Sequence, residues 1–216
     1  MLRRLSPVAE LVLVNLICFG PFAAISIVGL VERNTAHVFD DRRALAILGI
    51  ELFCGTLALL LLRARGWKPA DLGLRITLPQ TLGGMLLLFG ANFLIALIVQ
   101  VVRSATGINF DAVTSFEARL AWPVIVAYTL VNPLYDELFL VAYNVEAAKA
   151  SGAAFAITLS AAVRFLCHVE QGPIATVTVL PFGLIFAFVY WRWRAVWPLI
   201  VAHGVMDFAG LFPEVT

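Results

Sequence analysis

The chain has 216 residues, of which 62% are hydrophobic and 13% charged, and its formal net charge is +1. A soluble globular domain is about half apolar and about one quarter charged, so this composition excludes an ordinary soluble domain and indicates a polytopic helical membrane protein. The near-neutral charge offers no basic field, and we expect no nucleic acid partner. Cys18, Cys54 and Cys167 are widely spaced and form neither a disulfide framework nor a CxxC metal motif.

Apolar segments recur along the whole chain. A helix needs about 20 mainly apolar residues to span the hydrocarbon of a bilayer. We therefore expect an all-α bundle of about seven transmembrane helices, at residues 8–31, 44–63, 80–102, 121–145, 152–168, 173–191 and 195–212. The first segment follows Arg3 and Arg4 without a small-residue cleavage site, so we expect a retained span and not a signal peptide.

The segments between these spans predict how the chain is organised. Pro, Gly and charged residues mark 66–79 as an interfacial connector, and residues 103–120 form a polar link. There is no internal repeat or low-complexity tract. We expect a single membrane domain over residues 1–216, with accessory helices in 1–65 and the functional core in 66–216.

Lysine and arginine positions predict the orientation. With the N-terminus inside, the inner segments hold nine such residues: Arg3, Arg4, Arg63, Arg65, Lys68, Arg75, Lys149, Arg192 and Arg194. The outer segments hold five: Arg33, Arg42, Arg43, Arg103 and Arg119. The positive-inside rule therefore favours a cytoplasmic N-terminus.

Ionisable residues inside the last four predicted spans indicate a functional site. They are Asp136, Glu137, Arg164, His168, His203 and Asp207. A carboxylate at the centre of a span costs at least about 2.5 kcal/mol, so such groups face a cavity, pair with one another or take part in chemistry. Two further acids occur in the first two spans. We expect Glu10 to reach the interface and Glu51 to make a packing contact.

Helical spacing groups these residues into three polar faces. Arg164 and His168 are four residues apart, as are His203 and Asp207, so each pair shares a helix face. The adjacent Asp136 and Glu137 are separated by about 100° around an α-helix, so one of them faces the site while the other reaches a neighbouring helix.

The chemistry of these groups favours hydrolysis. A carboxylate beside an imidazole can take a proton from water, and a second His/Asp face can donate hydrogen bonds to a developing oxyanion. Cys167 adjoins His168, but adjacent helical residues point in different directions, which disfavours a Cys–His dyad. The pattern predicts attack of water on an amide bond within the membrane.

Three segments carry a resemblance to a known family. "DELFLVAY", "RFLCHVEQGP" and "WPLIVAHGVMDF" resemble the signature segments of the CAAX prenyl protease and bacteriocin-processing (CPBP or Abi) family of glutamic intramembrane endopeptidases. The connector "GWKPADLGLR" resembles the segment that precedes the family core, so the resemblance covers about residues 66–210. It implies a metal-independent peptidase without a cofactor, acting on a membrane-associated peptide or protein. The short chain and compact loops resemble prokaryotic members, which implies a cell membrane location.

The family patterns EExxxR, FxxxH and HxxxN or HxxxD transfer residue by residue. The resemblance implies that Asp136 and His168 activate water and that His203 and Asp207 stabilise the oxyanion. It places Glu137 at the second acid, Val141 at the arginine and Arg164 at the phenylalanine.

Two departures from these patterns bear on the mechanism. Asp136 is one methylene shorter than the Glu of the family, and Val141 replaces its arginine. We hypothesise that Arg164 supplies the missing charge from the neighbouring span; Glu137 as the base is a further possibility.

Three other functions fit parts of the sequence. An inactive relative could serve as a membrane scaffold or binding protein, and the two departures favour this alternative. A carboxylate and histidine set is also chemically adequate for zinc or manganese, although the chain lacks HExxH. An ion-coupled transporter would use intramembrane acids as well, but the chain has no inverted repeat.

Overall fold

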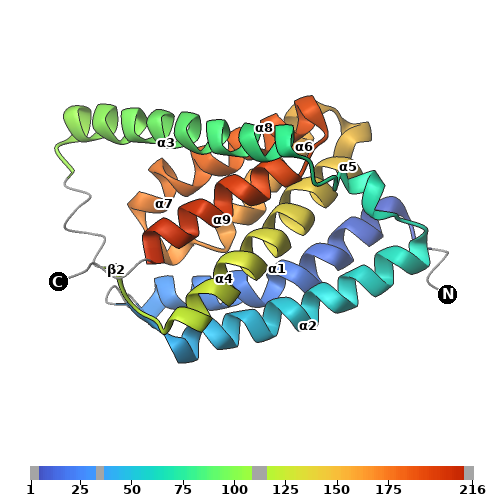
Figure 1. Ribbon diagram of the computed structural model, residues 1–216, viewed down its shortest axis with the longest axis horizontal. Coiled ribbons are helices and arrows are strands. Elements are labelled where there is room, and N and C mark those ends of the chain that lie inside the picture. Colours follow the sequence, from blue (N-terminus) through green and yellow to red (C-terminus); the bar gives the residue numbers. More distant parts are fainter. Residues whose placement is uncertain (1–4, 33–36, 109–115, 212–216) are drawn as a thin grey trace.

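The computed structural model describes residues 5–32, 37–108 and 116–211, which form a bundle of helices (Figure 1). The predicted all-α membrane bundle is confirmed. The α-helices are α1 (Pro7–Glu32), α2 (Asp41–Arg65), α3 (Leu78–Thr106), α4 (Trp122–Tyr135), α5 (Asn144–Ala148), α6 (Ala153–Leu166), α7 (Pro173–Val177), α8 (Val179–Trp193) and α9 (Trp197–Leu211). A π-helical segment, Asp136–Tyr143, joins α4 to α5, and 3-10 turns occupy Pro69–Leu72, Lys149–Ser151 and Val169–Gln171.

Helix lengths show that this is a multi-pass membrane protein. Among the described residues, five helices are long and apolar enough to cross a membrane, counting Trp122–Ser151 and Pro173–Trp193 each as one. The apolar helices α6 and α9 have 14 and 15 residues. At 1.5 Å per residue they are about 21–23 Å long, shorter than the hydrocarbon thickness of about 30 Å. The predicted spans agree with these helices, except that α6 ends at Leu166, before His168.

The helix α4 lies in the middle of the bundle, between α2 and α9 (Figure 1). The helix α3 runs along one edge, where it packs on α9, and α6 packs on α8. Large apolar side chains of α3, including Leu86, Phe89 and Phe93, are exposed on its outer face. In a membrane protein this face contacts lipid, which explains why a helix with so few buried residues is so apolar.

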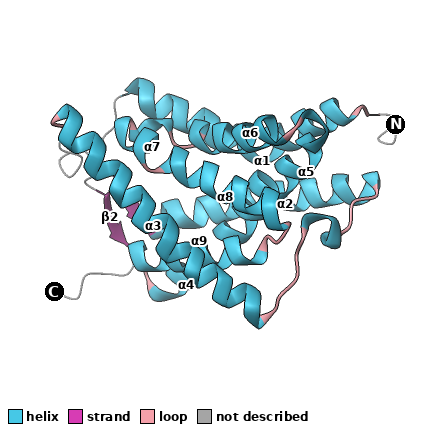
Figure 2. Ribbon diagram, turned by 90° about the horizontal axis from the view of Figure 1, so that it is seen from above, coloured by secondary structure: helices cyan, strands magenta, loops and turns pink. Residues whose placement is uncertain are grey.

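Two short strands close one end of the bundle (Figure 2). β1 (His37–Asp40) and β2 (Phe116–Arg119) pair in parallel. The sequence did not predict them, because four residues are too few to show an alternating pattern. Asp41, the first residue of α2, links the segments that follow the two strands. Its carboxylate accepts a hydrogen bond from the backbone N–H of Ala121 at 2.8 Å. The starts of α2 and α4 are therefore held side by side.

The other end of the bundle is joined by an ion pair at Glu10. The side chain of Glu10 pairs with Arg65, accepts from the indole N–H of Trp67 at 2.8 Å and contacts the Tyr143 hydroxyl at 3.4 Å. We expected Glu10 to reach the interface, but it is buried. The reason is tertiary: the connector after α2 folds back over the end of α1 and covers this carboxylate.

A glycine sets how closely α3 approaches α9. A Cβ atom on Gly84 would lie 2.7 Å from the carbonyl oxygen of Pro198, a backbone atom that has little room to move. The adjacent Gly83 has nothing within 4 Å of its equivalent position. Small residues at such contacts let helix backbones pack closely in membranes.

We therefore predict that Gly84→Ala destabilises the protein by about 1–3 kcal/mol through overpacking. Gly83→Ala, which gains the same helix propensity without a clash, is the matched control and should leave stability equal or higher. Thermal unfolding in detergent micelles measures both. Equal unfolding midpoints for the two variants would contradict this account of the α3–α9 contact.

Candidate active site

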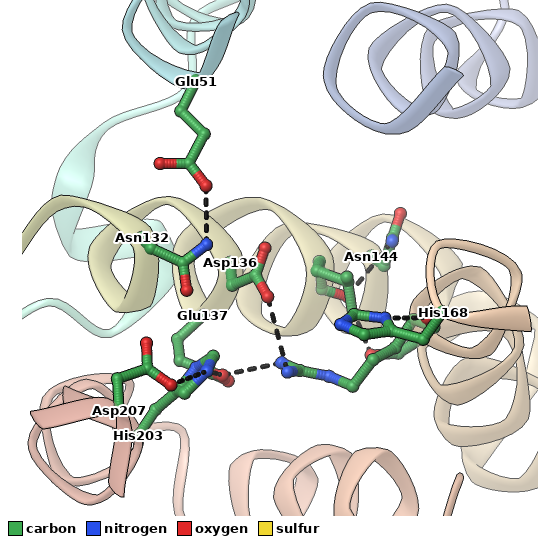
Figure 3. A network of polar contacts seen from close by, with 11 residues as sticks. Glu51, Asn132, Asp136, Glu137, Asn144, His168, His203 and Asp207 are labelled. Atoms are coloured by element: carbon green, nitrogen blue, oxygen red, sulfur yellow. Dashed lines mark hydrogen bonds and ion pairs between the residues drawn. The ribbon is translucent and has the colours of Figure 1, made fainter. Parts of the chain in front are cut away.

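The two adjacent carboxylates lie at the start of the π-helical segment, in the middle of the bundle (Figure 3). Asp136 lines a cavity, while Glu137 is completely buried. We expected a regular α-helix here. Pro133 lies one turn earlier and has no N–H to continue the helical hydrogen bonds, and π-helical turns are frequent at functional sites. The local change in winding sets where the two acids point.

Arg164 of α6 forms ion pairs with both carboxylates. Its Nη2 lies 2.6 Å from Glu137 Oε1 and its Nη1 lies 3.4 Å from Asp136 Oδ2. The guanidinium also stacks over the ring of Phe182, with its carbon 5.1 Å from the ring centre. Val141, where the family pattern has arginine, is fully buried among apolar residues. The positive charge beside the acids thus comes from α6.

His203 of α9 connects Glu137 to Asp207. Its Nδ1 is 2.8 Å from Glu137 Oε1, and its Nε2 is 3.5 Å from Asp207 Oδ1. Because a carboxylate accepts hydrogen bonds, Nδ1 carries the proton of the shorter contact. Both His203 and Asp207 line the cavity. The expected pairing of these residues across one helical turn is therefore present.

His168 lies beyond the end of α6, contrary to the prediction that it continues the helix. Its ring nevertheless turns back, and Nδ1 lies 2.8 Å from the carbonyl oxygen of Arg164. Since a carbonyl accepts only, Nδ1–H is the donor, which fixes the tautomer and leaves Nε2 with its lone pair when the ring is neutral. His168 also lines the cavity.

A close contact brings α9 to this site. A Cβ atom on Gly204 would lie 3.0 Å from the carbonyl oxygen of Thr129 on α4. This is the carbonyl that Pro133 cannot bond within the helix, since proline lacks the N–H four residues later. The neighbouring His203 is thereby placed against Glu137, so Gly204 and Pro133 together position the third polar face.

The cavity has a volume of about 870 Å³. Its polar wall is formed by Asp136, His168, His203 and Asp207, and its remaining lining is mostly apolar. Residues of α1 and α2 complete it, among them Phe22, Ile25 and Ile47. The lining residues of α1 run from its midpoint at Phe19 towards its C-terminal end, and those of α2 belong to its first half. The cavity therefore lies toward the end of the bundle that carries β1 and β2.

Glu51 of α2, which we expected to make a packing contact, lies at the site. Its side chain is buried and lines the same cavity, and its Oε1 accepts a hydrogen bond from the Asn132 amide at 2.6 Å. Asn132 is one helical turn before Asp136, as Figure 3 shows. A buried acid in an apolar span was the available signal. Spacing within the chain could not relate α2 to the later helices.

The described part of the chain contains no group of three or more His, Cys, Asp or Glu side chains arranged to hold a metal ion. The six site residues instead contact one another through ion pairs and hydrogen bonds. Cys167 lines the cavity as a free thiol with its sulfur 3.8 Å from the carbonyl oxygen of Phe19. His168 Nδ1 and Cys167 Sγ each contact a backbone carbonyl and not each other.

Comparison with known proteins identifies the central and C-terminal part of the chain. Residues 118–209 match the family model described as type II CAAX prenyl endopeptidase Rce1-like. The match includes the acids of the π-helical segment, both cavity histidines and Asp207. No curated protein and no solved structure matches the chain.

We predict that Arg164→Met destabilises the protein by about 3–5 kcal/mol, because it leaves Glu137 and Asp136 without their buried counter-charge. Adding Glu137→Gln should restore part of that loss, because the double variant removes both ends of the closest ion pair. Unfolding midpoints in detergent measure the effect, and Arg192→Met, which changes an exposed arginine of α8, is the control. Equal stability of the Arg164 and Arg192 variants would contradict the central role of Arg164.

Proposed function

Because residues 118–209 of the chain form a domain of the Rce1-like family of type II CAAX prenyl endopeptidases, we propose that the protein is an intramembrane endopeptidase that hydrolyses a peptide bond with activated water. The observation that carries this proposal is the convergence of Asp136, His168, His203 and Asp207 on one cavity within the bundle. Carboxylate and imidazole groups on one wall are suited to moving protons to and from a substrate bound there.

We propose that Asp136 and His168 act together as the general base. His168 donates through Nδ1 to the Arg164 carbonyl, so its Nε2 is available to take a proton from water. Asp136 orients the same water while Arg164 holds its other oxygen. The water oxygen then bonds to the amide carbon, and the proton passes to the amide nitrogen as the C–N bond breaks. Pre-aligned groups of this kind contribute roughly 10²–10⁴-fold to a rate.

His203 and Asp207 are the proposed oxyanion face. Glu137 accepts from Nδ1 of His203 and so fixes the ring, which directs Nε2 toward Asp207 and the cavity. When the ring is protonated at both nitrogens, Nε2–H is a donor in this position and stabilises the charge on a tetrahedral intermediate, an effect often worth about 10²–10³-fold. Glu137 itself is buried behind the cavity wall. We therefore assign it to positioning His203 and Arg164, and not to the base role.

The proposed substrate is a membrane-associated peptide or protein, cut close to an embedded or lipidated segment. The mostly apolar lining of the cavity supports this substrate class, since an apolar chain or lipid entering from the bilayer finds a matching surface. We propose that all of the chain forms one functional domain. The first two helices supply part of the cavity wall although they precede the segment that matches the family model.

We propose that the N-terminus faces the cytoplasm of a prokaryotic cell, following the distribution of Lys and Arg. The cavity lies toward the β1–β2 end of the bundle, and α1 starts at the other end. Substrates would then approach from the non-cytoplasmic half of the membrane.

The activity is tested with the protein in liposomes containing labelled apolar peptides. Asp136→Ala, His168→Ala and His203→Ala should each lower kcat/KM by about 10²-fold or more, since each removes a proton-transfer or oxyanion group. Asp71→Asn, an exposed acid in the connector, is the control and should retain activity. Peptide release followed by mass spectrometry gives both the rate and the cleaved bond.

Cleavage that survives all three alanine substitutions would contradict this mechanism. Absence of cleavage by the folded wild-type protein, across a broad peptide set, would favour the second candidate, an inactive relative that acts as a membrane scaffold. Asp136 in place of the family Glu is the observation behind that candidate. Asp136→Glu should raise the rate if reach limits it.

Orientation has its own test. A membrane-impermeant maleimide added to intact cells should label Ala121→Cys, at the exposed start of α4, and not Ala70→Cys in the connector. After lysis both positions should react. Native Cys18 and Cys54 are buried, and Cys167, a free thiol that lines the cavity, is replaced by serine in the background used for labelling. The reverse labelling pattern would show that the N-terminus faces outward.

A further inference from the structure

One buried carboxylate at the cavity takes no part in the proposed mechanism. Glu51 of α2 is only 2% exposed, and its Oε1 accepts from the Asn132 amide at 2.6 Å. Its Oε2 has no hydrogen-bond partner among the described residues. Glu51 lines the cavity, although Oε2 itself is covered by neighbouring atoms, so a rotation of the carboxylate would bring it to the space where a substrate would lie.

Two other carboxylates that line the cavity have cationic or imidazole partners. Asp136 contacts Arg164 at 3.4 Å, and Asp207 contacts His203 at 3.5 Å. Within the part of the chain that the structure describes, the Glu51 side chain has one hydrogen-bond partner, the neutral amide of Asn132. A carboxylate in a low-dielectric interior is strongly stabilised by a hydrogen-bonded cation, and far less by a neutral donor.

We propose that Glu51 forms a subsite for a cationic group of the substrate, a lysine, arginine or amine next to the scissile bond. The location beside a scissile bond rests on the proposed function, whereas the preference for a cationic group does not require cleavage. On binding, the ammonium or guanidinium group becomes the counter-charge of the Glu51 carboxylate, and Asn132 holds that carboxylate in place.

The position of Asn132 gives the register of this subsite. Asn132 precedes Asp136 by one helical turn, a rise of about 6 Å along α4. An extended peptide advances about 3.3 Å per residue, so 6 Å corresponds to about two residues. The cationic residue should therefore lie within two residues of the bond that faces Asp136.

The subsite is tested by binding and not by cleavage alone. Synthetic apolar peptides carry one lysine at successive positions, each paired with a peptide that has norleucine there. Fluorescence anisotropy with protein in nanodiscs measures both affinities. The wild type should prefer the lysine peptide by about tenfold or more at one position, the effect of a charged hydrogen bond in a buried site.

The variants separate charge from structure. Glu51→Gln keeps an oxygen for the Asn132 amide but loses the charge, so the lysine-to-norleucine ratio should fall close to one. Glu51→Asp keeps the charge and should retain a preference. Glu170→Gln, which changes another acid lining the cavity, is the matched control and should keep the wild-type ratio. Unfolding midpoints confirm that each variant is folded.

A wild-type ratio near one at every position would overturn the inference, as would a ratio that survives Glu51→Gln or is lost equally in Glu170→Gln. A lysine preference without any cleavage would uphold the subsite and contradict the proposed peptidase activity. Cleavage without the preference would uphold the activity and reject the subsite. Failure of one proposal is thus distinguishable from failure of the other.

Discussion

The site depends on one buried charge cluster, in which Arg164 holds Glu137 at 2.6 Å and Asp136 at 3.4 Å. A carboxylate without a counter-charge is costly in a membrane interior, and the Arg164 guanidinium lowers the cost of placing two acids there. Because His203 donates to the same oxygen of Glu137, the cluster also joins α4, α6 and α9. The ion pairs that stabilise two acids inside the bundle therefore also position the helices that form the cavity wall.

Backbone irregularities let the helices meet around this cluster. Pro133 precedes the π-helical segment and cannot bond the Thr129 carbonyl, and Gly204 packs directly against that carbonyl. A larger residue than Gly204 would separate α9 from α4 and withdraw His203 from Glu137. The end of α6 at Leu166 has a similar consequence, because His168 leaves the helix and turns its ring back onto the Arg164 carbonyl. Departures from regular helix thus set the directions of three site residues.

Much of the fold followed from local properties of the chain. Apolar length predicted the membrane spans, since a bilayer requires about 20 such residues whatever surrounds them. Helical spacing paired His203 with Asp207, a relation that depends on one helix alone. The π-helical winding, the strands β1 and β2 and the burial of Glu10 were not predicted. Each of them depends on contacts between segments far apart in the chain, and the strands are too short to show a pattern.

Composition by itself determined that this is a helical membrane protein. Motif spacing grouped its intramembrane acids and histidines, because an unpaired ionisable group is costly in a bilayer. Only the tertiary structure decided their separate positions. It turned Asp136 to the cavity and buried Glu137, supplied Arg164 from another helix where Val141 offers no charge, and brought Glu51 of α2 beside Asn132. The physical reason is that the partners of a side chain on other helices depend on how the helices pack. The spacing of residues within one helix carries no information about that packing.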